Sequence, residues 1–176
     1  LRGSPVELVR LENGVPVPHA EIVLEGYITA ERASEGPFVD ITGTQDLVRQ
    51  EPVIRLTRMM TCEDPIYHGL LPAGGEHKML MGVPYEPLIY RAVSKVARVK
   101  NVILTEGGCN YFHAVVQIEK ETEDDARRAI EAAFQAHGSL KHVLVVDSDI
   151  DIFDWRDLEF AIATRMRGDE DLVIHP

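Results

Sequence analysis

Cysteine is scarce in this chain: the 176 residues contain only Cys62 and Cys109. Two cysteines are too few for the disulfide framework of a small secreted domain, and they lack the close spacing of paired metal ligands. We therefore expect a reduced, cytoplasmic setting and no metal site built on cysteine.

Basic residues and long apolar runs are also lacking. Lys and Arg total 18 against 29 Asp and Glu, which gives a formal net charge of -11. Binding to a phosphate backbone requires clustered positive charge, so nucleic acid is excluded as a main partner. No apolar run approaches the roughly 20 residues of a membrane-spanning helix, so no membrane span is expected. No internal repeat or low-complexity tract is present, and the chain has the composition of an ordinary globular protein.

The first third of the sequence has the pattern of β-structure. Residues 6–11 and 21–28 are short apolar or alternating runs, and Asn13-Gly14, Pro16 and Pro18 between them are turn signals. Residues 53–60 alternate apolar and basic side chains, as a half-buried strand does. We expect a β-rich unit over residues 1–60.

After residue 60 the pattern changes to alternating helices and strands. Helices are predicted at 76–82, 86–97, 122–137 and 155–166, and strands at 99–104, 112–118 and 142–146. A Gly107-Gly108 turn is expected to join the first two of these strands. Thr122 and Asp125 have the spacing of a capping box, and Asp154 is expected to cap the last helix. The predicted fold class is α/β (α+β overall): a β-rich N-terminal piece, then a layered α/β domain over residues 61–176 with strands paired across helical crossovers.

Two carboxylates, Glu35 and Asp40, flank a Gly36-Pro37 pair directly after the second expected strand. Proline fixes its own φ and biases the preceding residue away from helix, so this segment is a turn or extended loop. A loop that holds two acids at one site lets their environments separate their proton affinities, which is the basis of acid–base catalysis. On the residues alone, a solvated surface turn remains open as the alternative.

Three other clusters carry weaker chemical signals. Residues 147–151 contain three aspartates but lack the glycine turn and distal glutamate of a calcium loop, which favours capping and solvation. Residues 74–78 fit either an anion-binding backbone nest or a helix entry with exposed charges. Cys109 and His113 suggest a thiol–imidazole pair, but no third orienting residue is evident, and His113 is predicted to be a packed or surface strand residue.

Several blocks follow one another in an order that is more specific than any single block: 20–26, 35–38 with Asp40 and Gly43, 65–67, 74–78, 113–118, 141–147, 149–151 and 155–165. Together they resemble the UbiD family of decarboxylases, which use prenylated flavin mononucleotide (prenylated FMN). The chain has Val39 where many members have glycine, and Ile41 where they have a polar residue. This variant is similar to an archaeal-type branch of the family.

The resemblance implies a role for each of the two acids. Asp40 corresponds to the residue that protonates the product after carbon dioxide leaves, and Glu35 to its orienting partner, which pairs with an arginine in the family. Ile41, next to the proton donor, is the residue expected to contact substrate. The implied activity is a non-oxidative (de)carboxylation of an aromatic or α,β-unsaturated acid through a prenylated flavin adduct. The implied cofactors include a divalent metal (Mn or Mg) and a monovalent cation such as K.

The chain opens at Leu1, in a stretch that is interior in the family, so we expect a fragment. On that expectation residues 1–60 are the closing strands of a split-barrel-like flavin-binding domain. The metal ligands and the arginine belong to the missing N-terminal half, and the fragment is inactive and binds no cofactor alone. Cofactor-binding residues are unassigned, although His137, Ser139 and Lys141 lie in a neighbourhood that approaches the flavin phosphate in the family.

Substrate and assembly remain open at this point. The archaeal-type variant admits an isoprenoid-precursor phosphate such as an anhydromevalonate phosphate, which would account for a basic tip at His77 and Lys78; aromatic and ubiquinone-precursor-like acids are the other options. The family forms homo-oligomers, so the chain is alternatively an assembly module without catalytic activity of its own. A third interpretation is an unrelated small α/β binding protein.

Overall fold

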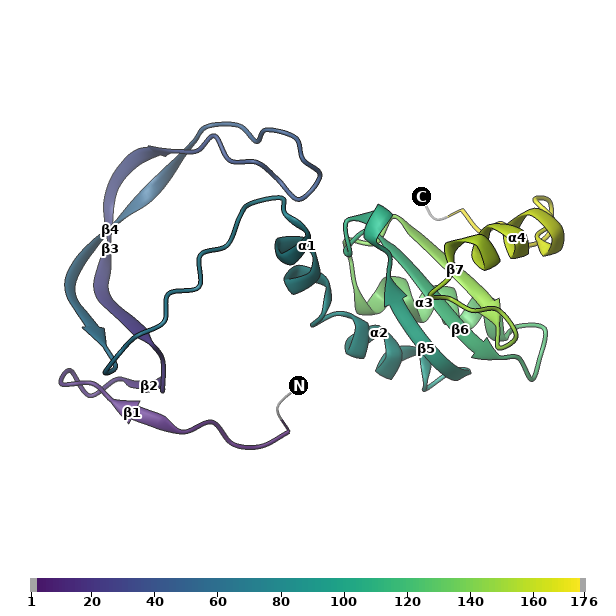
Figure 1. Ribbon diagram of the computed structural model, residues 1–176, viewed down its shortest axis with the longest axis horizontal. Helices are drawn as coiled ribbons and strands as arrows, with labels where there is room; N and C mark the ends of the chain where they lie inside the picture. Colours follow the sequence, from purple (N-terminus) through teal and green to yellow (C-terminus); the bar gives the residue numbers. More distant parts are fainter. Residues whose placement is uncertain (1–2, 175–176) are drawn as a thin grey trace. The chain divides into compact units, whose positions relative to one another are not determined.

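The computed structural model describes residues 3–174 and divides the chain into two compact units, Leu1–Ala73 and Gly74–Pro176 (Figure 1). Each unit is built from its own elements and is described separately. Residues 62–73, which form no helix or strand, belong to the first unit. Within the described residues, no helix has the length and apolar character required to cross a membrane.

The first unit begins with a small ribbon of two strands, β1 (Leu8–Arg10) and β2 (Pro16–Pro18), paired antiparallel. The predicted turn at Asn13-Gly14 joins them: Gly14 has a φ of 84°, a left-handed value that glycine adopts without strain. Its N–H donates to the Leu11 carbonyl at 2.9 Å. The turn signal in the sequence thus directs the local structure here. The prediction that Pro16 and Pro18 mark a turn is wrong, because both pair with β1 as the ends of β2.

A long antiparallel ribbon of β3 (Ile22–Glu35) and β4 (Arg49–Thr61) forms the rest of this unit. β3 continues beyond the predicted end at residue 28, because strand pairing with β4 holds the polar residues that follow the apolar run. The prediction that Glu35 lies in a loop is therefore wrong: it is the last residue of β3 and faces Arg49 in register. A Cβ on Gly26 would lie 2.5 Å from the Arg55 carbonyl oxygen, so this strand contact requires glycine.

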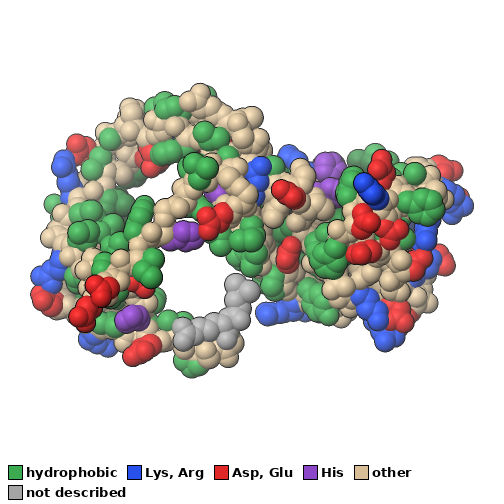
Figure 2. All heavy atoms as spheres, viewed as in Figure 1, with side chains coloured by type: hydrophobic (Ala, Val, Ile, Leu, Met, Phe, Trp, Pro, Cys, Tyr) green, Lys and Arg blue, Asp and Glu red, His purple; other side chains and the backbone are tan. Residues whose placement is uncertain are grey.

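The first unit has almost no apolar core. Ile41, 3% exposed, is the one buried hydrophobic residue among its described residues. Figure 2 shows hydrophobic side chains at the surface of the ribbon, and those of β3 and β4 that are exposed are Leu24, Tyr27, Ile28, Ile54, Leu56 and Met59. A two-stranded ribbon presents both faces to solvent and cannot enclose them alone.

The second unit contains a three-stranded sheet in the order β5-β6-β7. Its elements are α1 (Gly75–Gly82), α2 (Glu86–Val93), β5 (Arg98–Leu104), the 3₁₀ turn η1 (Glu106–Gly108), β6 (His113–Glu119), α3 (Asp125–Ala136), β7 (His142–Asp147) and α4 (Trp155–Arg165). β6 and β7 are parallel and joined by α3, as the predicted crossover requires. β5 and β6 are antiparallel, because the connection through η1 is a short turn. The predicted helical crossover is confirmed between β6 and β7, and the predicted Gly107-Gly108 turn is confirmed between β5 and β6.

Side-chain alternation along β6 divides the core between the two faces of this sheet. Ala114, Val116 and Ile118 pack in the larger cluster, together with Ile89 and Val93 of α2 and the buried alanines of α3. Val115, between them, points to the other face and packs with Leu158 of α4. Successive strand residues face opposite sides. The unit is therefore layered, with apolar clusters on both sheet faces.

Two predicted helix starts have different outcomes. Asp154 caps α4 as predicted, because its Oδ1 accepts from the Arg156 N–H at 2.9 Å. The Thr122 cap is wrong: its hydroxyl donates to Asp125 Oδ1 at 2.5 Å, and α3 starts at Asp125. Asp125, 3% exposed, also accepts from the Thr122 and Glu121 N–H groups. The Thr122 hydroxyl, followed by these amides, holds the pKa of the Asp125 carboxyl far below its usual range.

Candidate functional site

The candidate site is the loop between β3 and β4, residues 36–48, which carries Asp40. A narrow turn closes it: the Asp40 N–H donates to the Thr44 carbonyl at 2.8 Å, and the Gly43 N–H donates to the Asp40 carbonyl at 2.8 Å. Gly43 has a φ of 79°, which favours glycine. An isolated antiparallel bridge pairs Val39 with Gln45 on the two sides of this turn. The backbone around Asp40 is therefore specified by hydrogen bonds on both sides.

The two residues at the start of this turn have opposite environments. Ile41 is buried, whereas Asp40 is exposed. Burial of Ile41 removes an apolar side chain from water and so favours this conformation of the turn. The predicted contact between Ile41 and substrate stays a prediction.

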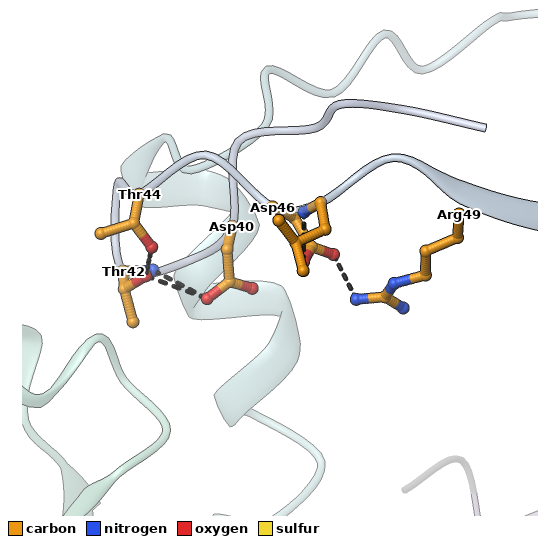
Figure 3. A network of polar contacts seen from close by, with 6 residues as sticks. Asp40, Thr42, Thr44, Asp46 and Arg49 are labelled. Atoms are coloured by element: carbon orange, nitrogen blue, oxygen red, sulfur yellow. Dashed lines mark hydrogen bonds and ion pairs between the residues drawn. The ribbon is translucent and has the colours of Figure 1, made fainter. Parts of the chain in front are cut away.

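The Asp40 carboxylate is hydrogen-bonded by Thr42, whose hydroxyl in turn contacts the hydroxyl of Thr44 in the same loop (Figure 3). Its Oδ2 accepts from Thr42 Oγ1 at 3.0 Å and from the Thr42 N–H at 3.4 Å. Thr42 Oγ1 lies 2.7 Å from Thr44 Oγ1, and either hydroxyl serves as donor in that contact. The sequence reasoning missed both threonines, although an aspartate side chain in a turn commonly accepts hydrogen bonds from the residue two positions on, which here is Thr42.

The threonine contact determines the direction of the Asp40 pKa. The hydrogen bond from the Thr42 hydroxyl is the main cause that lowers it from its ordinary value, and the negative charge of Asp46 opposes this weakly. A hydrogen bond to the charged form favours that form. A proton donor that acts near neutral pH requires the opposite shift, so the arrangement described by these residues stabilises the Asp40 carboxylate.

Glu35 is the last residue of β3 and lies directly before the loop. It is the register partner of Arg49, whose side chain forms an ion pair with Asp46. The hydrogen bond that Arg49 donates to the Asp46 carboxylate is the main cause that raises the pKa of Arg49, and the negative charge of Glu35 raises it weakly. Among the described residues, no hydrogen bond joins Glu35 to Asp40. The structure places both acids at one loop without bringing them into contact, and adds Asp46 and Arg49, which the sequence reasoning did not single out.

The aspartates at 147–151 serve the local structure. Asp149 pairs with Arg165 at 2.8 Å, and Asp151 Oδ1 accepts from the Phe153 N–H at 2.9 Å. No group of three or more metal-binding side chains occurs within residues 3–174. This loop borders a cavity of about 270 Å³ in the second unit, lined also by Asn101 and Gln117. None of the predicted site residues lines this cavity.

The other residues of the second unit that the sequence singled out lie in a helix entry, are buried, or, among the residues that the structure describes, have no hydrogen bond to their expected partner. Gly74 is the N-cap of α1, so residues 74–78 form a helix entry. No hydrogen bond joins Cys109 to His113 in the described part of the chain, and the nearest ring to His113 is His142, with centroids 5.8 Å apart. His137 is buried and its Nε2 lies 2.9 Å from the Tyr111 carbonyl oxygen.

Two family models together match nearly the whole chain. Residues 1–75 match the model described as the 3-octaprenyl-4-hydroxybenzoate carboxy-lyase Rift-related domain. Residues 78–176 match the C-terminal domain of the same carboxy-lyase.

Similar proteins extend well beyond the length of this chain. Anhydromevalonate phosphate decarboxylase of Methanosarcina mazei is 68% identical over 174 residues, which are 98% of this chain and 41% of the relative. The protein of the same name from Methanocaldococcus jannaschii is 57% identical, over 99% of this chain and 42% of the relative. The chain thus spans about two fifths of the length of these relatives.

The fold is also that of a solved structure. An evolved dimeric form of the UbiD-class enzyme HmfF from Pelotomaculum thermopropionicum, in complex with prFMN, superposes with a TM-score of 0.89 and 41% identity. The match covers 97% of this chain and 41% of that one.

Proposed function

The chain belongs to the UbiD family of carboxy-lyases, and on that basis we propose that the protein is a non-oxidative decarboxylase of an α,β-unsaturated acid. The two archaeal relatives described above support an anhydromevalonate phosphate as the substrate, rather than an aromatic acid. The observation that carries the proposal is the loop of residues 36–48, in which the backbone holds a carboxylate in one place. We assign Asp40 as the proton donor to the product, with Glu35 as its orienting partner.

The described residues fit part of a prenylated FMN site. When bound, this cofactor would supply the electron sink for loss of carbon dioxide. The exposed apolar side chains of the β3–β4 ribbon, such as Tyr27, Ile28 and Leu56, fit the apolar walls of a cofactor pocket. The divalent metal and the monovalent cation are not assigned to residues of this chain.

The residues of the loop have two tasks in this proposal. Ile41 anchors the turn, so the backbone of Asp40 has one position from which its carboxyl reaches the product carbon. Asp40 gives up its proton there and returns to the carboxylate that Thr42 hydrogen-bonds. A neutral pH optimum then requires that the substrate-bound enzyme raise the pKa of Asp40, since a carboxyl in an apolar, closed site disfavours the charged form.

We further propose that residues 1–60 contribute strands to a split-barrel-like flavin-binding domain. The exposed apolar faces and the long edges of the β3–β4 ribbon support this, because such edges pair with other strands. A crystal structure of the full-length gene product in which these edges have no strand partner would contradict it.

Asp40→Asn in the full-length gene product tests the catalytic assignment. The amide keeps the shape of the side chain but has no acidic proton, so we expect the flavin to be retained and turnover to fall by about a hundredfold or more. Flavin absorbance and decarboxylation of an anhydromevalonate phosphate are the measurements. Glu31→Gln, which removes an exposed carboxylate of β3 that pairs with Arg55, is the matched control and should keep full activity. Undiminished turnover of the Asp40 variant would remove this residue from its role.

A further inference from the structure

A chain of two hydroxyls ends on a single oxygen of Asp40: Thr44 Oγ1, Thr42 Oγ1 and Asp40 Oδ2, with separations of 2.7 and 3.0 Å (Figure 3). From this arrangement we propose that Thr42 and Thr44 are positioning residues, which hold the Asp40 carboxyl and accommodate it both with and without its proton. The proposal rests on the proposed function of Asp40 as the proton donor. It adds two residues whose hydroxyls act through Asp40 and need no contact with substrate.

The backbone of the loop brings the three side chains together. The hydrogen bonds from Asp40 N–H to the Thr44 carbonyl and from Gly43 N–H to the Asp40 carbonyl make Asp40 and Thr44 neighbours across the turn. Thr42 lies between them in the sequence, next to the buried Ile41. The hydroxyl of Thr42 therefore reaches both neighbours without any contribution from another element.

A hydroxyl is suited to both protonation states because it donates one hydrogen bond and accepts others. With Asp40 ionised, Thr42 donates to Oδ2, and Thr44 donates to Thr42. With Asp40 protonated, Oδ2–H donates to Thr42 Oγ1, whose own proton turns toward Thr44. In each protonation state, one proton lies between Thr44 Oγ1 and Thr42 Oγ1 and one lies between Thr42 Oγ1 and Asp40 Oδ2. Both hydrogen bonds are therefore present in both states.

The proton balance of the step is simple. The O–H bond of Asp40 breaks as a C–H bond forms at the product carbon, and the electron pair left on Oδ2 makes the carboxylate. Thr42 then turns its hydroxyl proton toward that oxygen. A proton from solvent water restores the carboxylic acid before the next turnover, and the two threonines end with the protons they began with.

Thr42→Val in the full-length gene product tests the inference through two readouts. Carbon-13 NMR of the Asp40 carboxyl should show a raised pKa, because the hydrogen bond that favours the ionised form is gone. Turnover that needs the protonated acid falls as pH rises through that pKa, so the alkaline limb of the kcat profile should move to higher pH. The plateau of kcat should drop roughly tenfold to a hundredfold with KM unchanged, since the donor is less well placed.

Matched variants separate positioning from a general loss of structure. Thr42→Ser keeps the hydroxyl and should restore both the pKa and kcat. Thr57→Val removes a threonine hydroxyl of β4 that donates to the Glu25 carbonyl at 3.1 Å, and should leave both unchanged. Thr44→Val removes only the outer link and should raise the Asp40 pKa by less than Thr42→Val does, because hydrogen bonds in a chain strengthen one another.

Failure of this inference is distinguishable from failure of the proposed function. If Asp40 titrates in Thr42→Val as it does in Thr57→Val, the positioning role is overturned, whatever the activity. If Thr42→Val raises the Asp40 pKa but Asp40→Asn keeps full turnover, the assignment of Asp40 as proton donor fails. The result then supports only the effect of Thr42 on the Asp40 carboxyl. If circular dichroism shows Thr42→Val to be misfolded, Thr44→Val decides, and an unchanged Asp40 pKa in that variant overturns the inference.

Discussion

Burial of a histidine in a fold disfavours its protonated, charged form relative to a histidine in water. His137, 2% exposed, stacks on the Tyr85 ring with centroids 3.9 Å apart, and its Nε2 lies 2.9 Å from the Tyr111 carbonyl oxygen. Burial lowers the pKa of His137 below its ordinary value, and the contact with the carbonyl opposes this only partly. Folding therefore favours the neutral ring.

The His137 shift predicts acid sensitivity of the second unit. Since the folded pKa lies below the unfolded value of about 6.5, the unfolded chain binds more protons as pH falls through 6.5. The free energy of unfolding should then decrease, by at most about 1.4 kcal/mol for each pH unit from this group, until the folded pKa is reached. Urea unfolding at pH 7.5 and 5.5 measures it.

His137→Phe is the comparison, because the ring stays and the titration is lost. The loss of stability between the two pH values should be smaller in this variant. His113, whose pKa burial and the charge of His142 also lower, should account for part of what remains. An equal loss in the variant and the wild type would show that His137 has no such effect.

At the scale of the elements, local sequence signals predicted where most helices and strands lie in the sequence, but not which strands pair with one another. α2 and α4 start where proline and aspartate signals predicted. β3 runs to Glu35 instead of ending at residue 28, because its second half is held by pairing with β4 and has no apolar pattern of its own. A sequence window contains the periodicity of one segment and does not contain the strand that lies beside it.

The end of α1 provides a test of close packing between elements. A Cβ on Gly82, the last residue of α1, would lie 2.1 Å from the Asn110 carbonyl oxygen. Because that oxygen belongs to the backbone, Gly82→Ala should destabilise the fold by roughly 1–3 kcal/mol. Gly75→Ala, at the start of the same helix with no atom within 4 Å, is the control and should be neutral or slightly stabilising. Urea midpoints measure both, and equal midpoints would contradict the packing argument.

At the scale of the whole molecule, the two units differ in what they bury. The second unit has apolar clusters on both faces of its sheet, whereas Ile41 is the one buried hydrophobic residue described in the first. Apolar burial is the main favourable term in folding. Stability within this chain should therefore be concentrated after residue 73.

Separate polypeptides of residues 1–73 and 74–176 test this difference. The 74–176 polypeptide should unfold cooperatively in urea, and the 1–73 polypeptide should show no cooperative transition, because a two-stranded ribbon without a core is marginal in water. Amide hydrogen exchange on the 176-residue chain is the control: protection should concentrate in β5, β6, β7 and α3. A cooperative transition of the 1–73 polypeptide would refute the interpretation.

Sequence reasoning was sufficient for the family, the mixed α/β fold and the loop that carries Asp40, because these depend on residue order, periodicity and turn residues that are read along the chain. It also placed Glu35 in that loop, which is wrong, because pairing with β4 makes Glu35 the last residue of β3. Distances across the fold supplied the rest. They show the Thr42 hydroxyl bound to Asp40 with Thr44 bound to Thr42, the antiparallel pairing of β5 with β6, and Asp125 holding the segment before α3 instead of Thr122 capping it. Hydrogen-bond donors set the direction of a pKa shift, and whether a donor lies within about 3 Å of a carboxyl oxygen depends on the folded backbone.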